Sequence, residues 1–462
     1  MRSDENETYR LVIVFGEASR VLLVRDTEGR VSLPEVTIPK WQRVAESLTA
    51  EVKESWNLEA VCMFDPVYQD RLTDVRCNYQ VLESCDPLWV PPKNYALFRA
   101  GSVSPESFVS PEESRILGCS LRLLNEYDSG AKPGPFARSG WLGRLRAWVQ
   151  QQLRPHGLVL ADRQRHVNSS PFFNLMRFET VCDSAVWFKA VGEPNRREYP
   201  ITVGLGQDYP RYFPKLLGIH PQWHGWLTAE SSLPLLQDTD DIEKWKCAVE
   251  TLADLQVELV NRERYLLDLG CIDWRIGQIT GRIDPFLTAV EEIMKSQPKT
   301  PPPILSKCEL DDLGGVMKSA CQRLQVLGIP STYLHGDFGP QNILSSGAQC
   351  LFIDLAESGV GHPFLTFQYL LDCLHRSHPE LDAAHSDLRR AYGARWSSLV
   401  SEREMMEAVK VVPLVTLLWH AMSSRGWNDA EVYSDADSAK YVRGLVRRMK
   451  ARAAGLECVV AA

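Results

Sequence analysis

The sequence predicts an α+β protein in which a smaller, sheet-rich part precedes a larger, mostly helical part. Its length of 462 residues exceeds what one ordinary hydrophobic core organises, so two or three domains are expected. Hydrophobic residues make up 44% and charged residues 24% of the chain, which is typical of a folded globular protein and not of a disordered one. Strand-like runs come first and helical periodicity follows, an order that suits two lobes.

The composition limits the classes of partner. A formal net charge of -8 argues against a nucleic-acid binder and weakly favours a neutral or cationic small molecule. The twelve cysteines include no C-x-x-C pair and no Cys/His cluster at zinc spacing, which argues against a structural metal site. The first residues lack the apolar region of a signal peptide, and no apolar run reaches the roughly 18 residues of a membrane span. We therefore expect a cytoplasmic protein without a membrane partner.

The first elements are two strand-like runs, Leu11–Phe15 and Val21–Arg25, joined by the short sequence GEAS. An amphipathic helix is expected over Trp41 to Leu58. Its apolar residues recur at every fourth position: Val44, Leu48, Val52 and Trp56.

This order of strands, an LP dipeptide and an acidic helix that ends in WNL resembles the Nudix hydrolase fold over residues 8 to 125. The Nudix box keeps Glu51 and Glu54. Its other positions are changed: Ala50 stands for Arg, Ser55 for Glu, and Val36 and Asn57 for Gly. Two carboxylates at i, i+3 share a helix face, but Nudix chemistry needs a denser carboxylate cluster for its divalent metals. We expect a Nudix-like α/β domain that binds or packs without hydrolysing; alternatively, both glutamates lie on a solvated helix face.

The predicted domain order continues with a linker, because residues 126–140 (EYDSGAKPGPFARSG) are rich in Gly, Pro and Ser. An amphipathic helix over Trp141 to Leu153 and a hairpin made of Phe172–Thr180 and Ala185–Ala190 follow. Residues 242–259 again show helical spacing. The expected division is a Nudix-like domain (1–125), a linker (126–140), a sheet-rich lobe (141–232) and a helical lobe (233–462).

The segment from Tyr333 to Asp354, YLHGDFGPQNILSSGAQCLFID, carries the strongest chemical signal. Two short runs flank a Gly-containing turn, which predicts a hairpin. If the strands pair symmetrically, Asn342 faces Asp354, with Cβ atoms about 4.5–5.5 Å apart, a distance that suits two ligands of one hard cation. Asp337 lies just upstream in a Gly- and Pro-containing loop, where a carboxylate is placed to accept a proton from a hydroxyl aimed at a phosphate.

The motifs HGDFGPQN, LFID and GVGHP resemble those of the aminoglycoside phosphotransferase and choline kinase family, whose members share the bilobal protein-kinase-like fold. The resemblance implies that Asp337 is the catalytic base and that His335 orients its loop. It also implies that Asn342 and Asp354 hold Mg²⁺ and that the second substrate is ATP or GTP.

The same resemblance places nucleotide-binding groups in the sheet-rich lobe. It implies that Lys189 binds the nucleotide phosphates and that Glu198, at the start of the next helix, is its ion-pair partner. The stretch 166–171 is expected to be a loop over the nucleotide, with backbone N–H groups and the hydroxyls of Ser169 and Ser170 as donors. The segment that ends at Glu230 is expected to offer main-chain groups to the base; alternatively, it is an ordinary edge strand and Lys189 is solvated.

One departure from the family concerns the residue that braces the catalytic loop. Many members have an Asp within a few residues of the Gly-x-Pro, but this chain reads GHPFLTFQYLLD, and Asp372 is too distant for that role. Candidate acceptor-binding residues are Asp311 and Asp312, which suit an amine, and Trp419 with His420, which suit a ring or cation. The alternative is that the two acids lie on the surface and that the Trp lies in the core.

The main hypothesis is therefore a phosphotransferase that uses ATP or GTP and Mg²⁺ to phosphorylate a hydroxyl of a small metabolite. Two alternatives remain open. One is a kinase-like protein that binds nucleotide or metabolite without efficient transfer, and the other is an enzyme that uses phosphorylation to activate a substrate for condensation or cyclisation.

Overall fold

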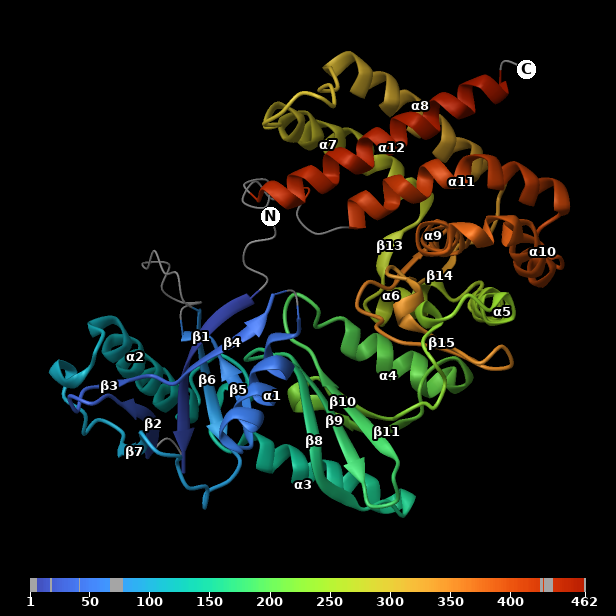
Figure 1. Cartoon of the computed structure of the whole chain (residues 1–462). Helices are drawn as coiled ribbons and strands as arrows, with labels where there is room; N and C mark the ends of the chain where they lie inside the picture. Colours follow the sequence, from blue (N-terminus) through green and yellow to red (C-terminus); the bar gives the residue numbers. More distant parts are fainter. Residues whose placement is uncertain are drawn as a thin grey trace. The chain divides into compact units, whose positions relative to one another are not determined.

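The computed structural model describes residues 6–16, 19–40, 42–66, 78–423, 427 and 435–460 of the chain, and it divides into two compact units. Unit 1 consists of residues 1–199 and 215–230, and unit 2 of residues 200–214 and 231–462. Figure 1 shows the elements of both units.

Unit 1 begins with a seven-stranded mixed sheet in the order β3-β2-β1-β6-β5, with β4 paired to β1 and β7 to β2. Its strands are β1 (Asn6–Phe15), β2 (Arg20–Arg25), β3 (Val31–Ser32), β4 (Glu35–Pro39), β5 (Ala60–Phe64), β6 (Asn78–Ser84) and β7 (Tyr95–Arg99). The two predicted strand runs are confirmed as β1 and β2, which pair antiparallel with Val14 opposite Val21. The β1–β6 pair is parallel.

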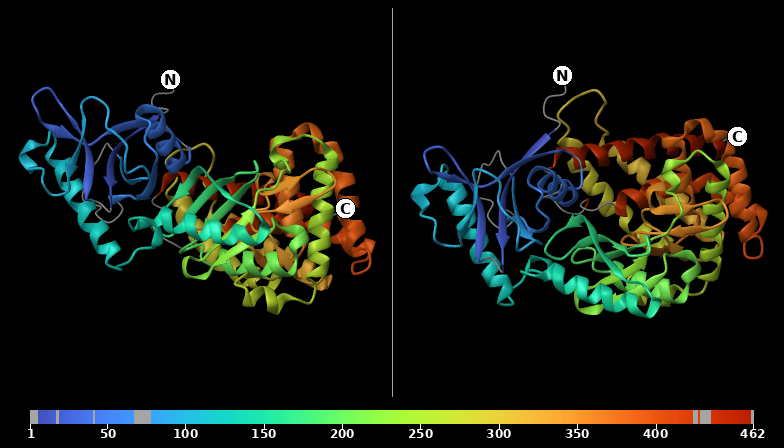
Figure 2. Two further views of the ribbon diagram at one scale, coloured as in Figure 1. Left: turned by 90° about the horizontal axis from the view of Figure 1, so that it is seen from below. Right: turned by 60° about the horizontal axis from the view of Figure 1, so that its bottom comes forward.

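The alternation of side chains along β1 gives this sheet two apolar faces. Leu11 and Ile13 join the cluster that contains the helix α1 (Val44–Trp56), whereas Val12 and Val14 join the cluster that contains α2 (Pro111–Asp128). The two helices therefore cover opposite faces of the sheet (Figures 1 and 2). The predicted helical spacing is confirmed, since Leu48 and Val52 are fully buried; Trp41 lies outside the described residues.

A second, antiparallel sheet completes unit 1 in the order β11-β12-β10-β9-β8. Its strands are β8 (Leu160–Ser169), β9 (Asn174–Thr180), β10 (Ala185–Ala190), β11 (Leu216–His220) and β12 (Gly225–Ala229). The predicted hairpin is confirmed as β9 and β10, with Ala185 opposite Glu179. The predicted amphipathic helix is α3 (Trp141–Leu153), whose apolar residues are buried in unit 1.

The segment predicted to be a linker is packed into unit 1. One hydrophobic cluster contains residues of the first sheet, of α2 and α3, and of the second sheet. Phe136, from the predicted linker, is fully buried in it and makes edge-on contact with Trp141 and Phe188. The Gly and Pro content correctly indicates irregular backbone, but the burial of one aromatic ring fixes that backbone in place.

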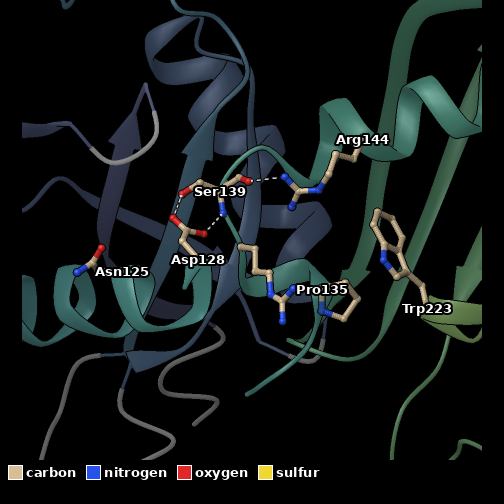
Figure 3. Close-up of a pocket in the computed structure, with 7 residues that line it drawn as sticks. Asn125, Asp128, Pro135, Ser139, Arg144 and Trp223 are labelled. Atoms are coloured by element: carbon tan, nitrogen blue, oxygen red, sulfur yellow. Dashed lines mark hydrogen bonds between the residues drawn. The ribbon is translucent and has the colours of Figure 1, made fainter. Parts of the chain in front are cut away.

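Polar contacts also hold this segment (Figure 3). The carboxylate of Asp128, the last residue of α2, accepts hydrogen bonds from the backbone N–H and the hydroxyl of Ser139, each at 2.8 Å. Arg144 of α3 donates to the carbonyl of Ser139, also at 2.8 Å. Asp128, Ser139 and Arg144 line a cavity of about 520 Å³. Their hydrogen bonds to one another tie the end of α2 to the start of α3.

Unit 2 is mostly helical and contains two small sheets, β13-β17-β14 and β15-β16. Its helices are α5 (Ile242–Glu258), α6 (Glu263–Asp268), α7 (Ile276–Lys295), α8 (Lys307–Val326), α9 (Phe364–Ser377), α10 (His385–Trp396), α11 (Glu402–Ser423) and α12 (Ala436–Val460), and α4 (Glu198–Asp208) enters it from unit 1. The strands are β13 (Ile272–Trp274), β14 (Thr332–Leu334), β15 (Ile343–Ser345), β16 (Cys350–Phe352) and β17 (Gly359–Gly361). The helix predicted over 242–259 is confirmed as α5.

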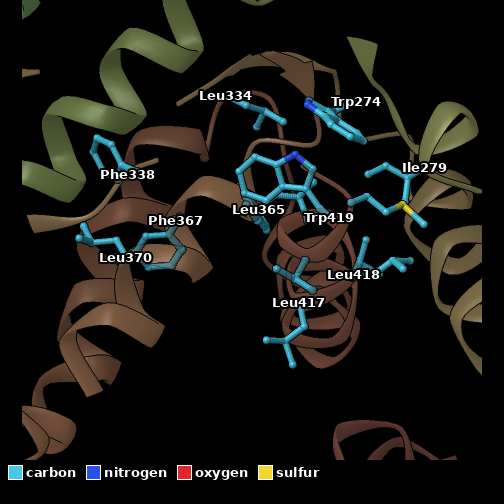
Figure 4. Close-up of a cluster of buried hydrophobic side chains, with 14 of the residues drawn as sticks. Trp274, Ile279, Leu334, Phe338, Leu365, Phe367, Leu370, Leu417, Leu418 and Trp419 are labelled. Carbon is cyan, nitrogen blue, oxygen red and sulfur yellow. The ribbon is translucent and has the colours of Figure 1, made fainter. Parts of the chain in front are cut away.

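The core of unit 2 brings the strands that flank the HGD segment together with α9 and α11 (Figure 4). Leu334 of β14 and Phe338 of the following loop are fully buried there. Trp419 of α11 is also fully buried in this core. The loop is therefore anchored on both sides by apolar side chains.

Among the described residues, α11 is the one helix whose length and hydropathy would suffice to cross a membrane. In the most apolar 18-residue stretch of α11, 61% of the residues are buried inside the protein. The core helix of a globular protein can have the same length and hydropathy.

Candidate active site

The hairpin predicted after the HGD motif is present, but its register differs from the prediction by one residue. Ser345 faces Cys350, not Leu351, and Ile353 donates its N–H to the carbonyl of Asn342 at 3.0 Å. The direct Asn342–Asp354 pairing was therefore wrong. The reason is the turn: Ser346 to Gln349 close it through a hydrogen bond of 3.0 Å between the Ser346 N–H and the Gln349 carbonyl, with Gly347 at φ +89°.

Asp354 follows β16 in an unusual backbone conformation. Its φ is 63°, in the left-handed region that few residues other than Gly, Asn and Asp adopt. The chain thus bends immediately after the strand, at the residue to which the motif assigns a metal-binding carboxylate. Strained backbone of this kind is often kept where a side chain must be aimed.

Hydrogen bonds from two side chains hold the carboxylate of Asp337. Asn342 donates through its Nδ2 atom to both the backbone carbonyl and the Oδ2 atom of Asp337, each at 2.9 Å. The Tyr369 hydroxyl of α9 donates to Oδ1 at 3.3 Å. Because both carboxylate oxygens are engaged, the orientation of the Asp337 side chain is fixed, while each oxygen keeps a lone pair for a substrate hydroxyl.

His335 joins the start of the loop to the end of the hairpin. It is 1% exposed, and its Nε2 atom lies 3.0 Å from the carbonyl oxygen of Ile353, the residue before Asp354. Burial lowers the pKa of this imidazole, so the ring is neutral and Nε2–H is the donor. Gly336 is required next to it, because a Cβ atom there would lie 2.1 Å from the carbonyl oxygen of Glu357.

Gln256 of α5 braces the loop in place of the missing Asp. Its amide donates to the carbonyls of Tyr333 and Pro363, at 3.0 and 3.1 Å, and so connects the strand before the loop to the last residue of the GHP sequence. Tyr392 donates to the Gln256 side-chain oxygen at 2.6 Å, which completes the amide's bonding. Asp372 is bonded elsewhere, to Gln368 at 2.9 Å, as its distance along the chain predicted. Helical spacing marked Gln256 only as part of a helix; its role as a brace had no sequence signal.

The predicted ion pair between Lys189 and Glu198 is present in unit 1. The Nζ and Oε1 atoms are 2.6 Å apart, and the side chains are 16% and 2% exposed. Glu198 is the first residue of α4, as expected. The Lys189 ammonium also lies 5.8 Å from the centre of the Trp226 ring. A pair this well shielded keeps the ammonium in a defined position on β10.

The loop predicted over 166–171 was wrong for its first four residues, because β8 extends to Ser169. His166 is buried and accepts a hydrogen bond from the Cys62 N–H at 3.3 Å, so this part of β8 packs against β5 and does not face solvent. Desolvation lowers the pKa of His166 to about 3.

The turn that does form runs from Ser170 to Phe173, and its N–H groups are already bonded. The Ser170 hydroxyl accepts from the N–H groups of Phe172 and Phe173 at 3.3 and 3.0 Å. Ser169 donates its hydroxyl to the Cys62 carbonyl at 3.4 Å. The expected nucleotide contacts of Ser169 and Ser170 would have to compete with these bonds.

Glu230, at the end of the predicted connector, is held by its neighbours. Arg177 donates to its two carboxylate oxygens at 2.6 and 2.8 Å, and Trp187 donates to Oε1 at 2.9 Å. These hydrogen bonds, chiefly those from Arg177, lower the pKa of Glu230. Its side chain is therefore engaged within the sheet, so only the main chain of this segment suits the predicted contact with a base.

Unit 2 contains a cavity of about 290 Å³ whose lining is linked to Asp337 through one side chain. Its wall includes Tyr369, the side chain that donates to Asp337, and it is bounded by residues of α9, α11 and α12. We refer to it as the α9–α11–α12 cavity. His420 lines it, as the sequence suggested for an acceptor site, whereas Trp419 faces the core and Asp311 and Asp312 are exposed on α8.

The residues assigned to Mg²⁺ fit a weakly coordinated hard cation. Within the described ranges, no cluster of three His, Cys, Asp or Glu side chains could hold a metal by itself. Mg²⁺ is usually held by one or two protein oxygens together with substrate phosphates. Since the Asn342 nitrogen donates to Asp337, its side-chain oxygen is the atom of this residue that suits a cation. The Asp354 carboxylate is the second oxygen ligand that the motif implies.

Comparison with protein families and with curated proteins found no match. Solved structures do resemble the chain. An ethanolamine kinase of Plasmodium vivax is 14% identical over 76% of this chain and 91% of its own, with a TM-score of 0.43. A macrolide 2'-phosphotransferase of Brachybacterium faecium is 13% identical over 65% and 97%, with a TM-score of 0.41.

An aminoglycoside phosphotransferase of Streptomyces rimosus, solved with ADP and streptomycin, is 13% identical over 61% of this chain and 99% of its own, with a TM-score of 0.35. These similar proteins are small-molecule kinases and phosphotransferases, the kinds of enzyme that the HGD motif resembles. At such low identities and TM-scores, a function has to be argued from this chain's own side chains.

Proposed function

We propose that the protein is a phosphotransferase that moves the γ-phosphoryl group of ATP or GTP to a hydroxyl of a small metabolite. The observation that carries this proposal is the Asp337 carboxylate, which Asn342 and Tyr369 hold by hydrogen bonds. Tyr369 also lines a cavity large enough for a small acceptor. A partly exposed carboxylate whose orientation is held by hydrogen bonds is the arrangement that general-base catalysis needs.

Asp337 is the proton acceptor in this reaction. Its carboxylate takes the proton of the acceptor hydroxyl as that oxygen attacks the γ-phosphorus in line with the leaving group. Phosphoryl transfer requires little covalent chemistry of the protein, so positioning is the main contribution. Asn342, Tyr369 and the Gln256 brace supply that positioning here.

Asn342 and Asp354 are the groups that would hold Mg²⁺. When bound, the cation would supply positive charge that offsets the negative charge developing on the transferred phosphoryl group. The side chains contribute a fixed pair of oxygens, one set by the bond of Asn342 to Asp337 and the other by the left-handed backbone of Asp354.

Lys189 is the proposed ligand of the nucleotide phosphates. Its partner Glu198 is almost fully buried and fixes the ammonium on β10, so that Lys189 loses little freedom on binding phosphate. ATP and GTP are both kept as donors, because the connector before Glu230 would use main-chain groups for the base.

The first part of unit 1 is proposed to be a Nudix-like domain that packs and does not hydrolyse. Glu54 is exposed, and Glu51 accepts a hydrogen bond from Ser55 at 2.7 Å, on the face of α1 away from the sheet. The opposite face of α1 and the apolar face of α2 are committed to the core of unit 1. Its role in this proposal is to support the second sheet, which carries Lys189.

The experiment is a nucleotide and acceptor screen on the full chain. Thermal shift with ATP and with GTP, each with and without Mg²⁺, identifies the donor, since saturation at about a hundred times the Kd adds roughly 2.7 kcal/mol. Phosphorus NMR then follows phosphate ester formation with hydroxylated metabolites. A Mg²⁺-dependent shift with ester formation supports transfer; a shift with no ester from any acceptor points to a binding protein; no shift with either nucleotide contradicts the proposal.

A further inference from the structure

The α9–α11–α12 cavity has a defined helical origin. Residues spaced by one or two helical turns on each of the three helices converge on it. The six that matter are Tyr369 and Arg376 of α9, Thr416 and His420 of α11, and Tyr441 and Arg448 of α12. Spacings of seven residues on α9 and on α12 place each helix's pair on one face. All six belong to unit 2, as does Asp337.

The charges on this wall are unbalanced. Arg376 and Arg448 both line the cavity, and neither has an ion-pair partner among the described residues. The acid on the wall, Asp372, is already engaged by Gln368 at 2.9 Å and by Arg452 at 3.3 Å. A neighbouring cavity of about 340 Å³ shares Arg376 and Arg448 and adds Arg452 to its lining.

Arg448 stands out among the basic residues that follow Tyr441 on α12, because several others have structural partners. Arg443 donates to the Ile293 carbonyl at 3.0 Å, and Lys450 pairs with Glu309. Arg447 donates to the Pro303 carbonyl at 3.2 Å. The helix thus uses its other cations to bind its neighbours and turns Arg448 to the cavity.

The rest of the wall offers neutral hydrogen-bond groups. Thr416 is 1% exposed, lines the cavity, and its hydroxyl has no hydrogen-bond partner in the described part of the chain. A buried hydroxyl of this kind costs free energy unless a ligand completes it. His420 lies 2.7 Å from the Tyr441 hydroxyl, and burial, with Arg376 as a second cause, lowers its pKa to about 4, so the ring is neutral.

We infer that the acceptor of the proposed reaction is a small hydroxylated metabolite that carries an oxyanion, a carboxylate or a phosphate, held by Arg376 and Arg448 while its hydroxyl reaches Asp337. The inference rests on the proposed function for the identity of the reaction and on this cavity for the class of acceptor. It reverses the expectation from the net charge of -8, which favoured a neutral or cationic partner, because the local charge of the wall decides recognition.

The test is a matched acceptor panel with three arms: hydroxy acids such as glycerate, phosphates such as glycerol 3-phosphate, and uncharged or cationic alcohols such as glycerol and choline. Binding to the full chain is measured by calorimetry, and phosphate ester formation with Mg²⁺ and the nucleotide by phosphorus NMR. We expect binding in one anionic arm, weakened about 10- to 100-fold in Arg376→Gln and in Arg448→Gln, the loss typical of a charge-assisted hydrogen bond. The anionic arm that responds identifies carboxylate or phosphate.

Lys440→Gln is the control, because Lys440 is an exposed cation on the same helix and lies outside the lining of both cavities. It should leave binding unchanged. Anion binding that is lost in both arginine variants without any ester formation in the parent would keep the inference and reject the proposed reaction. Ester formation with glycerol or choline that both arginine variants retain would keep the reaction and overturn the inference. Anion binding that persists in both variants, or no binding in either anionic arm, would also overturn it.

Discussion

Removing one partner of the Lys189–Glu198 pair should destabilise unit 1 strongly. The two charged atoms are 2.6 Å apart and Glu198 is 2% exposed, so Lys189→Met leaves a buried carboxylate without its cation. Breaking a buried pair in this way costs about 3–5 kcal/mol, against about 0–1 kcal/mol for an exposed pair. Because Lys189 keeps 16% exposure, we expect the lower end, about 3 kcal/mol.

The assay is urea unfolding of the full chain in a double-mutant cycle. Lys189→Met and Glu198→Leu should each lose about 3 kcal/mol, whereas the double variant that combines them should recover most of the loss, because an apolar pair replaces the charges. Glu179→Gln is the control on the same sheet, since Glu179 is 39% exposed beside Arg177 and should cost less than about 1 kcal/mol. If both single variants behaved like this control, the pair would not be the buried anchor described above.

Three further predictions concern other parts of the chain. Asp337→Asn should lower phosphate ester formation by about 10²- to 10⁴-fold and change the Kd of the nucleotide less than about twofold, because only the proton acceptor is removed; equal turnover in the variant would exclude Asp337 as the base. Phe136→Ala should cost about 3–5 kcal/mol in urea unfolding, since the ring is fully buried, and an unchanged midpoint would show that residues 126–140 are a tether after all. Burial lowers the pKa of His166 from 6.5 to about 3, so between these pH values the unfolded chain binds a proton that the folded chain does not. The contribution of His166 to the free energy of unfolding is therefore complete above about pH 6.5 and falls towards pH 3 by about 1.4 kcal/mol per pH unit. His166→Gln should remove about one proton from the pH dependence of the free energy of unfolding, and an unaltered pH dependence would mean that the ring is not buried.

Local apolar patterns predicted several elements of the fold. The strands β1 and β2 were found as short continuous apolar runs and the helix α1 by apolar residues at every fourth position, and the structure buries those residues. The Lys189–Glu198 pair was expected from the resemblance of the motifs to the kinase family, and the structure contains it between two residues nine positions apart.

Turn length and interactions between distant segments escaped prediction. The one-residue error at Asn342 came from the number of residues in the turn, which a symmetric pairing does not reveal. Residues 126–140 read as a linker because Gly and Pro report backbone freedom and not the burial of Phe136. The strand β8 replaced an expected loop because His166 finds its partner on β5, about a hundred residues earlier.

The candidate site divides in the same way. The HGD motif located Asp337, Asn342 and Asp354, whose separation along the chain is short. Tyr369, Gln256 and the arginines of the α9–α11–α12 cavity come together only through the packing of helices far apart in sequence. The seven-residue spacing of Tyr369 and Arg376 on α9 is the one local sign that both face the same volume.

Calorimetric titration of the full chain with ATP and with GTP, with and without Mg²⁺, and of the Asp354→Asn variant in parallel, tests the central claim most directly. The account predicts binding of one nucleotide per chain that depends on Mg²⁺ and weakens at least about tenfold in the variant, because a charged ligand of the cation has been removed. Binding of neither nucleotide, or binding that is equally tight without Mg²⁺ and in Asp354→Asn, would contradict it.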